Sequence, residues 1–296
     1  MSPAEALAAQ APLPSPHRAP KIAPNPSGFG ALITGIDVRR LDEAGFAAVE
    51  DAFNRHSVVC IRGQELCPAE LRDFVNRFGA LATHTLVQYT LPKMREIYVL
   101  SNIEDDGKPI GAHNEGIGWH TDLSYKQRPV MATALYGIVC PPEGADTLFA
   151  DMTSAYEELP EDERKRLDGL RIHHSYQSWM ATRADRAPLT DEQKAQTPDV
   201  WHPLVRTHPV TRRKSLYIGT GTVYGIEGMD RAEGKALVDR LVEYATQEKF
   251  TLAHKWRVGD LVMWDNRCTL HTGTLFDDVR YKRLIHRLMV EGDVPF

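Results

Sequence analysis

The sequence has little that would tie the protein to a membrane or to nucleic acid. No run approaches the roughly 18 consecutive apolar residues of a membrane-spanning helix, and the N-terminus lacks the apolar core of a secretory signal. Lys and Arg total 35 against 40 Asp and Glu, a net charge of −5, whereas proteins that bind nucleic acid through its phosphates are usually basic. We therefore expect a cytoplasmic protein that binds neither membrane nor nucleic acid.

Cysteine is also scarce and shows no pattern. The four cysteines are Cys60, Cys67, Cys140 and Cys268, with no C-x-x-C pair and no metal-ligand spacing. In a chain of 296 residues, this favours reduced, buried thiols over disulfides or a cysteine metal site.

The chain divides into a short arm and one large domain. Residues 1–28 are rich in Ala and Pro, which predicts a flexible arm. From about residue 97, short β-like runs alternate with turn-rich loops, as in a sandwich or barrel. Helices are expected over residues 41–56, 68–78 and 230–247, and an irregular insertion over 180–200. We predict a β-rich α+β fold with residues 29–296 as a single domain.

The first chemical motif pairs a histidine with an aspartate. His120 and Asp122 are two residues apart, so on a strand they share one face. His271 lies far downstream, after an apolar strand and before a turn glycine. Strands distant in sequence can be neighbours in a double-sheet fold. Two His and one carboxylate form the facial triad of non-haem Fe(II) oxygenases, which leaves positions open for a chelating cosubstrate and O₂.

A pair of arginines sharpens this interpretation, because an H-x-D tripeptide alone is common. Arg283 and Arg287 point to the same face of a predicted strand. Burying both is costly unless each meets an anion, and the arginine fork binds carboxylates through two hydrogen bonds. The alternative is an exposed strand edge with surface arginines.

Taken together, the motifs resemble a known enzyme family. They are residues 119–122 (W-H-T-D), 144–149 (G-A-D-T-L-F), 259–267 (G-D-L-V-M-W-D-N-R) with His271, and 283–287 (R-L-I-H-R). Over residues 29 to 292 the chain resembles the taurine / 2,4-dichlorophenoxyacetate dioxygenases, which depend on Fe(II) and 2-oxoglutarate. Residues 203–208, 213–219 and 226–229 are closer to the aryloxyalkanoate-degrading branch. The resemblance implies a double-stranded β-helix core (jelly roll, cupin-like) with flanking helices and long insertions.

The resemblance also implies a role for each matching residue. His120, Asp122 and His271 match the catalytic iron ligands. Arg283 matches the arginine that pairs with the distal carboxylate of 2-oxoglutarate, and Thr147 the threonine that assists there. Arg287 matches an arginine that meets the acid group of the substrate or the chelating end of 2-oxoglutarate.

Three further residues match substrate contacts in the family. His84 lies where taurine enzymes carry a histidine for the substrate anion, Asn102 matches a polar pocket residue, and Tyr125 matches an aromatic wall. Residues 105–118 and the segment after His271 depart from the taurine pattern, which leaves the substrate less well defined than the reaction.

The expected function is hydroxylation of a small organic anion, with release of succinate and CO₂ from 2-oxoglutarate. An aryloxyalkanoate-type carboxylate is favoured, with collapse of the product and ether cleavage, as in herbicide or xenobiotic degradation. The alternatives are a dioxygenase of taurine or another alkylsulfonate, a cupin-like metal- or small-molecule-binding protein without turnover, and a zinc hydrolase, which would have no use for Arg283. The resemblance also suggests a homo-oligomer.

Overall fold

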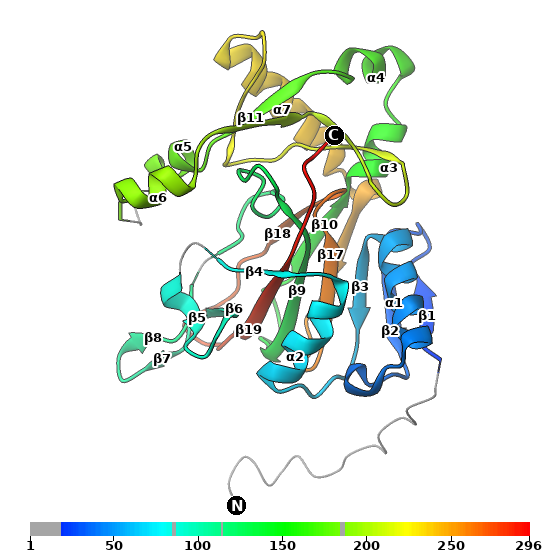
Figure 1. Cartoon of the computed structure of the whole chain (residues 1–296), viewed down its shortest axis with the longest axis vertical. Coiled ribbons are helices and arrows are strands. Elements are labelled where there is room, and N and C mark those ends of the chain that lie inside the picture. The colour runs from blue at the N-terminus through cyan, green and yellow to red at the C-terminus, as the bar shows by residue number, and fades with distance from the viewer. Residues whose placement is uncertain (1–18, 85–86, 114, 184–186) are drawn as a thin grey trace, which may run out of the picture.

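The computed structural model describes residues 19–84, 87–113, 115–183 and 187–296, shown in Figure 1. Within these ranges the α-helices are α1 (Glu43–His56), α2 (Pro68–Val75), α3 (Met152–Glu157), α4 (Glu161–Leu167), α5 (Tyr176–Ala181), α6 (Asp191–Gln196) and α7 (Arg231–Ala245). Among the described residues, no helix is long and apolar enough to cross a membrane.

A large sheet runs through the centre of the molecule. Its path is β1 (Lys21–Pro24), β2 (Ala31–Thr34), β3 (Val58–Ile61), β17 (Leu261–Asp265), β9 (Val130–Val139), β19 (Leu284–Glu291), β6 (Met94–Ser101) and β5 (Thr90–Leu91), with β4 (Leu81–Ala82) pairing off β19. β2 and β3 are parallel, and the other pairs are antiparallel. Strands from both ends of the chain therefore share one sheet.

A smaller antiparallel sheet packs against the large one. It consists of β16 (Thr251–His254), β10 (Thr147–Asp151) and β18 (Thr269–Gly273). Phe149 of β10 lies opposite His271 of β18 in the register, and its ring centroid is 5.4 Å from that of Trp264 on β17. Both rings belong to a buried cluster that also contains Leu135 and Ile285 of the large sheet. The two sheets therefore enclose a common core.

Helices α1 and α2 cover the other face of the large sheet, as Figure 1 shows. α1 begins at Asp42, whose side chain accepts a hydrogen bond from the Gly45 backbone N–H, and ends at Ser57 in the left-handed conformation. The apolar stripe that predicted these helices is buried against the sheet. Its residues are Val49 and Phe53 of α1 and Leu71 and Phe74 of α2, which share a cluster with Met263 and Leu288.

Most of the remaining elements gather at one end of the molecule, the top of Figure 1. They include a sheet of β12 (Val200–Pro203), β11 (Arg171–His174) and β15 (Val223–Ile226), and a pair of β13 (Val205–Thr207) and β14 (Lys214–Leu216). A separate two-stranded sheet pairs β7 (Glu104–Asp105) with β8 (Lys108–Pro109). A second core cluster packs α3 and α7 against β14 and β15. It includes Leu216, Ile226, Leu241 and Phe250.

Two boundaries differ from the sequence predictions. Lys21–Pro24, assigned to the arm, form β1 and pair with β2, so the sheet begins before residue 29. This strand is exposed along its length and lies at the sheet edge, where proline is tolerated and no hydrophobic alternation marks it. Residues 1–18 of the predicted arm lie outside the described residues. Within 180–200, predicted to be irregular, α6 begins at Thr190 with a capping box that includes Gln193.

Candidate active site

The structure brings together the three residues that the sequence predicts as metal ligands. His120 forms an isolated bridge with His271 of β18, through backbone hydrogen bonds of 3.0 and 2.8 Å. The imidazole rings are 4.2 Å apart between centroids. One ligand atom from each of His120, Asp122 and His271 lies within 4.8 Å of the others. The three side chains can thus share one ion, although His120 and Asp122 lie in a loop rather than on a strand.

Hydrogen bonding, burial and nearby charges favour metal binding by these three side chains. His120 Nδ1 is 2.7 Å from the Gly118 carbonyl; because a carbonyl only accepts, Nδ1 donates this hydrogen bond, which leaves Nε2 as the nitrogen that can bind a metal. Burial lowers the pKa of His271 to about 3, so this ring is neutral at pH 7. Burial alone would raise the pKa of Asp122, but His271, Arg287 and His120 hold it at about 2. Two imidazoles and a carboxylate fit Fe(II).

Two other groups of potential ligands are less suited to bind a metal. They are His208 with Asp265 and Cys268, and Cys60 with His254 and Asp260. Arg267 bonds Asp265 at 2.8 Å and Arg62 bonds Asp260 at 2.9 Å. Burial raises the pKa of Cys60 to about 12 and also raises that of Cys268. Each carboxylate is thus already paired with an arginine, and the thiols stay protonated. The His120 group is therefore the best metal site among the described residues.

Both predicted arginines lie near cavities. Arg287 Nη1 is 3.7 Å from Asp122 Oδ1, and its guanidinium stands 4.8 Å from the Tyr98 ring centroid. Arg283 lines a cavity of about 280 Å³; its Nε is buried without a hydrogen-bond partner, and burial lowers its pKa to about 10. Arg287 belongs to β19, which pairs with β9 and β6 on its two sides. The alternative of an exposed strand edge is therefore wrong.

Asn102 lies beside Arg283 rather than beside the His120 group. It lines the smaller cavity, and its amide nitrogen donates to the carbonyls of Asp278 and Tyr281 at 2.8 and 2.9 Å. Its amide oxygen accepts from the Arg283 backbone N–H at 2.8 Å. The side chain is thus committed to the turn that carries Arg283. A substrate contact of Asn102, which the resemblance implies, stays a prediction, since these hydrogen bonds show only how its polar atoms hold the turn.

Thr147 is buried on β10. Its hydroxyl oxygen accepts a hydrogen bond of 3.0 Å from the indole N–H of Trp256. In the register it lies opposite Gly273 of β18. Ala145, two residues before it, and the paired Gly273 both line the cavity of Arg283, so Thr147 lies close to that cavity.

A larger cavity of about 770 Å³ opens onto the metal-ligand group. His84, Tyr125 and Arg287, the remaining residues predicted as substrate contacts, line it together with His120 and Asp122. The ring of His84 is 4.2 Å from that of Tyr98 between centroids, the ring over which Arg287 stands. The pocket therefore places a histidine and an arginine near the predicted iron ligands.

The wall of this cavity is aromatic and comes largely from α5. Tyr176 stacks on Tyr125 with ring centroids 4.3 Å apart and an interplanar angle of 27°, and Trp179 lies 5.6 Å from Tyr176. Met180 and Leu189 complete the lining here. We call Tyr125, Tyr176, Trp179, Met180 and Leu189 the aromatic wall. The α5 members were not predicted from the sequence, although the pattern Y-x-x-W-M at residues 176–180 is typical of an amphipathic turn.

A His-Asp-His group at an open cavity, with Arg287 beside it and a second arginine on a neighbouring cavity, is the arrangement of a non-haem iron oxygenase with an anionic cosubstrate. The model of the family described as taurine catabolism dioxygenase TauD, TfdA family matches residues 21–289, so the chain belongs to that family. Like its relatives, the protein is a 2-oxoglutarate-dependent dioxygenase that uses Fe(II) and O₂.

The similar proteins point to one branch of the family. The chain is 38% identical over 262 residues to the alpha-ketoglutarate-dependent 2,4-dichlorophenoxyacetate dioxygenase of Burkholderia sp. (strain RASC), covering 85% of this chain and 87% of that one. It is 31% identical to the (S)-phenoxypropionate/alpha-ketoglutarate-dioxygenase of Sphingobium herbicidovorans, covering 92% and 95%. A crystal structure of AAD-2 with Mn(II) and N-oxalylglycine matches with a TM-score of 0.81 at 31% identity, covering 94% and 98%. The predicted resemblance to the aryloxyalkanoate-degrading branch is confirmed.

Proposed function

We propose that this enzyme hydroxylates an aryloxyalkanoate next to its ether oxygen, with release of succinate and CO₂ from 2-oxoglutarate. The main support for the proposal is that one cavity is lined by the aromatic wall, by Arg287 and by the ligands His120 and Asp122. A substrate in this cavity can contact the wall and the arginine while it lies beside the metal site. A hydroxyl on the carbon that bears the ether oxygen makes a hemiacetal, and this product collapses to a phenol and a carbonyl acid. Ether cleavage thus needs no further catalytic group.

The residues divide into three roles in this proposal. His120, Asp122 and His271 hold Fe(II), which supplies the oxidation of the substrate C–H bond when it is bound together with 2-oxoglutarate and O₂. Arg283 binds the distal carboxylate of 2-oxoglutarate, since its buried Nε has no protein partner, and Thr147 assists at the edge of the same cavity. Arg287 and His84 receive the substrate carboxylate, while the aromatic wall excludes water and holds the ring.

The two packed sheets support the jelly-roll form of the fold. β9, β17 and β19 of the large sheet and β10 and β18 of the small sheet pack on the cluster that contains Phe149 and Trp264. His271 stands on β18, and Arg287 on β19, so each sheet contributes a residue to the site. We propose a double-stranded β-helix core within a single domain, because cutting the chain midway would separate His120 from His271.

A substrate panel tests the proposal. Succinate formation with Fe(II), ascorbate and 2-oxoglutarate is measured against aryloxyacetates, aryloxypropionates, taurine and other alkylsulfonates. We expect aryloxy acids to give the highest kcat/KM, with release of the phenol. A preference for taurine or another sulfonate supports the alkylsulfonate alternative instead, and the absence of stimulated turnover with every member contradicts the substrate class.

The remaining expectations concern where and how the enzyme works. We propose a small-molecule anionic substrate as its partner, action in the cytoplasm, and assembly as a homo-oligomer. Size-exclusion chromatography with light scattering tests the last point: a mass of a single 33.3 kDa chain in solution contradicts it.

A further inference from the structure

A buried chain of hydrogen bonds ends on the carboxylate of Asp122. Thr133, on β9, places its hydroxyl oxygen 2.6 Å from Asp122 Oδ2. The amide nitrogen of Asn266 lies 2.9 Å from the same hydroxyl oxygen. Thr133 is fully buried, and Asn266 and Asp122 are 1% and 5% exposed. These interactions are therefore shielded from competing water.

The donor and the acceptor of each of these hydrogen bonds follow from the groups around Asn266. The amide oxygen of Asn266 faces two groups that only donate, the indole N–H of Trp264 at 3.0 Å and the backbone N–H of Asp122 at 3.2 Å. The amide nitrogen must then face Thr133 and donate to it. Because the Thr133 oxygen accepts this bond, its own proton points to Asp122 Oδ2. Asn266 thus donates to Thr133, and Thr133 donates to Asp122.

Asn266 also holds the backbone of the H-x-D segment. Its carbonyl oxygen accepts a hydrogen bond of 2.8 Å from the hydroxyl of Thr121, and its backbone N–H donates to the Met131 carbonyl at 2.8 Å. One asparagine therefore ties the segment that carries Asp122 to β9. This leaves the Asp122 carboxylate little freedom to rotate.

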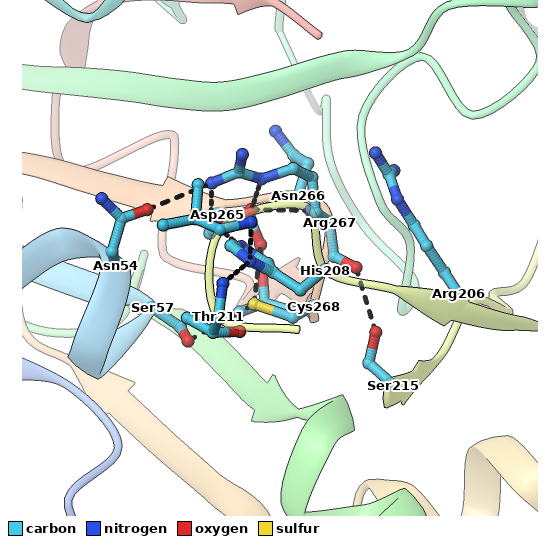
Figure 2. A network of polar contacts seen from close by, with 12 residues as sticks. Asn54, Ser57, Arg206, His208, Thr211, Ser215, Asp265, Asn266, Arg267 and Cys268 are labelled. Atoms are coloured by element: carbon cyan, nitrogen blue, oxygen red, sulfur yellow. Dashed lines mark hydrogen bonds and ion pairs between the residues drawn. The ribbon is translucent and has the colours of Figure 1, made fainter. Parts of the chain in front are cut away.

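The position of Asn266 is fixed in turn by its buried charged neighbours, shown in Figure 2. Asp265 Oδ2 is 2.9 Å from His208 Nε2, and Asp265 Oδ1 accepts from Arg267 Nε at 2.8 Å. His208 Nδ1 accepts from the backbone N–H of Thr211 at 3.0 Å, so Nε2 carries the proton that meets Asp265. A neutral histidine and an arginine thus clamp the residue that precedes Asn266.

We propose that Thr133 and Asn266 are positioning residues that fix the orientation of the Asp122 carboxylate and thereby set the affinity of the site for its metal. Oδ2 is held by Thr133, while Oδ1 faces His120 Nε2 at 3.9 Å and Arg287 Nη1 at 3.7 Å. Without the hydroxyl, the carboxylate can turn away from the other two ligands. This inference rests on the proposed iron site. Partners of metal ligands in other proteins typically change affinity by about 10- to 100-fold.

The test is the dissociation constant of Mn(II), followed through the electron paramagnetic resonance signal of the free ion. Thr133→Val removes the hydroxyl at nearly constant shape and is expected to raise the Kd by about 10- to 100-fold. Thr133→Ala removes the same hydroxyl without placing a methyl group against the Asn266 amide, and is expected to act in the same direction. Thr133→Ser keeps the hydroxyl and is expected to bind Mn(II) as the wild type does.

A matched control separates positioning from a general loss of stability. Thr269 is also buried, but its hydroxyl donates to the Asp265 carbonyl at 2.7 Å. Thr269→Val is expected to lower the melting temperature of the metal-free protein without changing the Kd for Mn(II). If Thr269→Val weakens Mn(II) as much as Thr133→Val does, or if both Thr133→Val and Thr133→Ala keep the wild-type Kd, the inference is wrong.

His120→Ala distinguishes failure of this inference from failure of the site. It is expected to abolish Mn(II) binding. If it does so while the two Thr133 variants bind normally, only the positioning role is overturned. If His120→Ala binds Mn(II) with the wild-type Kd, the proposed iron site itself is wrong.

Discussion

Arg283 has a buried guanidinium nitrogen without a hydrogen-bond partner, and it lines a cavity that shares Glu115 and Ile117 with the larger cavity at the metal-ligand group. Leaving such a charge unpaired is costly, and burial already lowers its pKa to about 10. A carboxylate in this cavity would offset the cost. The turn held by Asn102 fixes where the charge stands.

Arg283→Gln is expected to raise the KM for 2-oxoglutarate by roughly 10- to 150-fold, since a hydrogen bond to a charged group contributes about 1.5–3 kcal/mol. Steady-state succinate formation at varied 2-oxoglutarate measures the effect. Arg280→Gln is the control, because that arginine is exposed and lies over the Tyr281 ring. An unchanged KM in Arg283→Gln would show that the cosubstrate binds elsewhere.

At the residue level, the sequence predicted the groups that perform chemistry better than those that position them. His120, Asp122 and His271 were found because their residue types and spacing are informative, and the structure places them within reach of one ion. Thr133 has no such signal, because an isolated threonine in an apolar strand looks like ordinary core. Asn266 lies within the motif of residues 259–267, but the motif does not show which groups its side chain contacts. The local pattern could not show that Asn102 closes a turn more than 170 residues away in the chain.

At the level of elements, α5 supplies three residues of the aromatic wall. The helix begins at Ser175, whose hydroxyl accepts from the Ser178 backbone N–H at 3.1 Å, and this start directs Tyr176, Trp179 and Met180 into the cavity. Gly221 permits the approach, because a Cβ there would lie 3.0 Å from the indole nitrogen of Trp179. Under the proposed function, the ring of an aryloxyalkanoate would stack on this wall.

Trp179→Ala is expected to lower kcat/KM for an aryloxyacetate by about 5- to 30-fold, from the loss of apolar contact of about 1–2 kcal/mol. The rate with a short alkyl acid should change less, because such a substrate does not reach the wall. Trp201→Ala is the matched control: Trp201 is 38% exposed and stacks on His173 away from the cavity. Equal losses for both substrate types would argue against a ring-binding role.

Elements with strong periodic patterns were predicted well, and those fixed by tertiary contacts were not. The helices near residues 41–56, 68–78 and 230–247 are confirmed, because their apolar stripes face the core. β1 has no buried residue to reveal it, and α6 has none either. Both depend on a neighbouring strand or on capping groups rather than on a hydrophobic face.

For the molecule as a whole, buried histidines make stability depend on pH. Burial lowers the pKa of His202 to about 4 and that of His174 well below its usual value. Both bind protons more readily when unfolded, where the pKa is about 6.5. The stability they contribute is therefore complete above pH of about 6.5 and is lost as the pH falls towards the folded values.

His202→Gln tests this dependence by urea unfolding at pH 7.5 and pH 5. From its pKa of about 4, His202 alone should cost the wild type about 2 kcal/mol of unfolding free energy at pH 5. Glutamine can still donate to the Lys126 carbonyl, which His202 Nε2 meets at 3.0 Å. The variant should lose less stability between the two pH values. Equal losses in both proteins would assign the acid sensitivity to other groups.

We propose above all that the enzyme cleaves the ether bond of an aryloxyalkanoate bound in the cavity at His120, Asp122 and His271. The most direct measurement is the stoichiometry of 2-oxoglutarate consumed, succinate formed and phenol released with phenoxyacetate, compared with taurine at the same concentration. We predict equal amounts of all three with phenoxyacetate, and little succinate above background with taurine. Succinate formation without phenol, or faster turnover with taurine, would contradict the account.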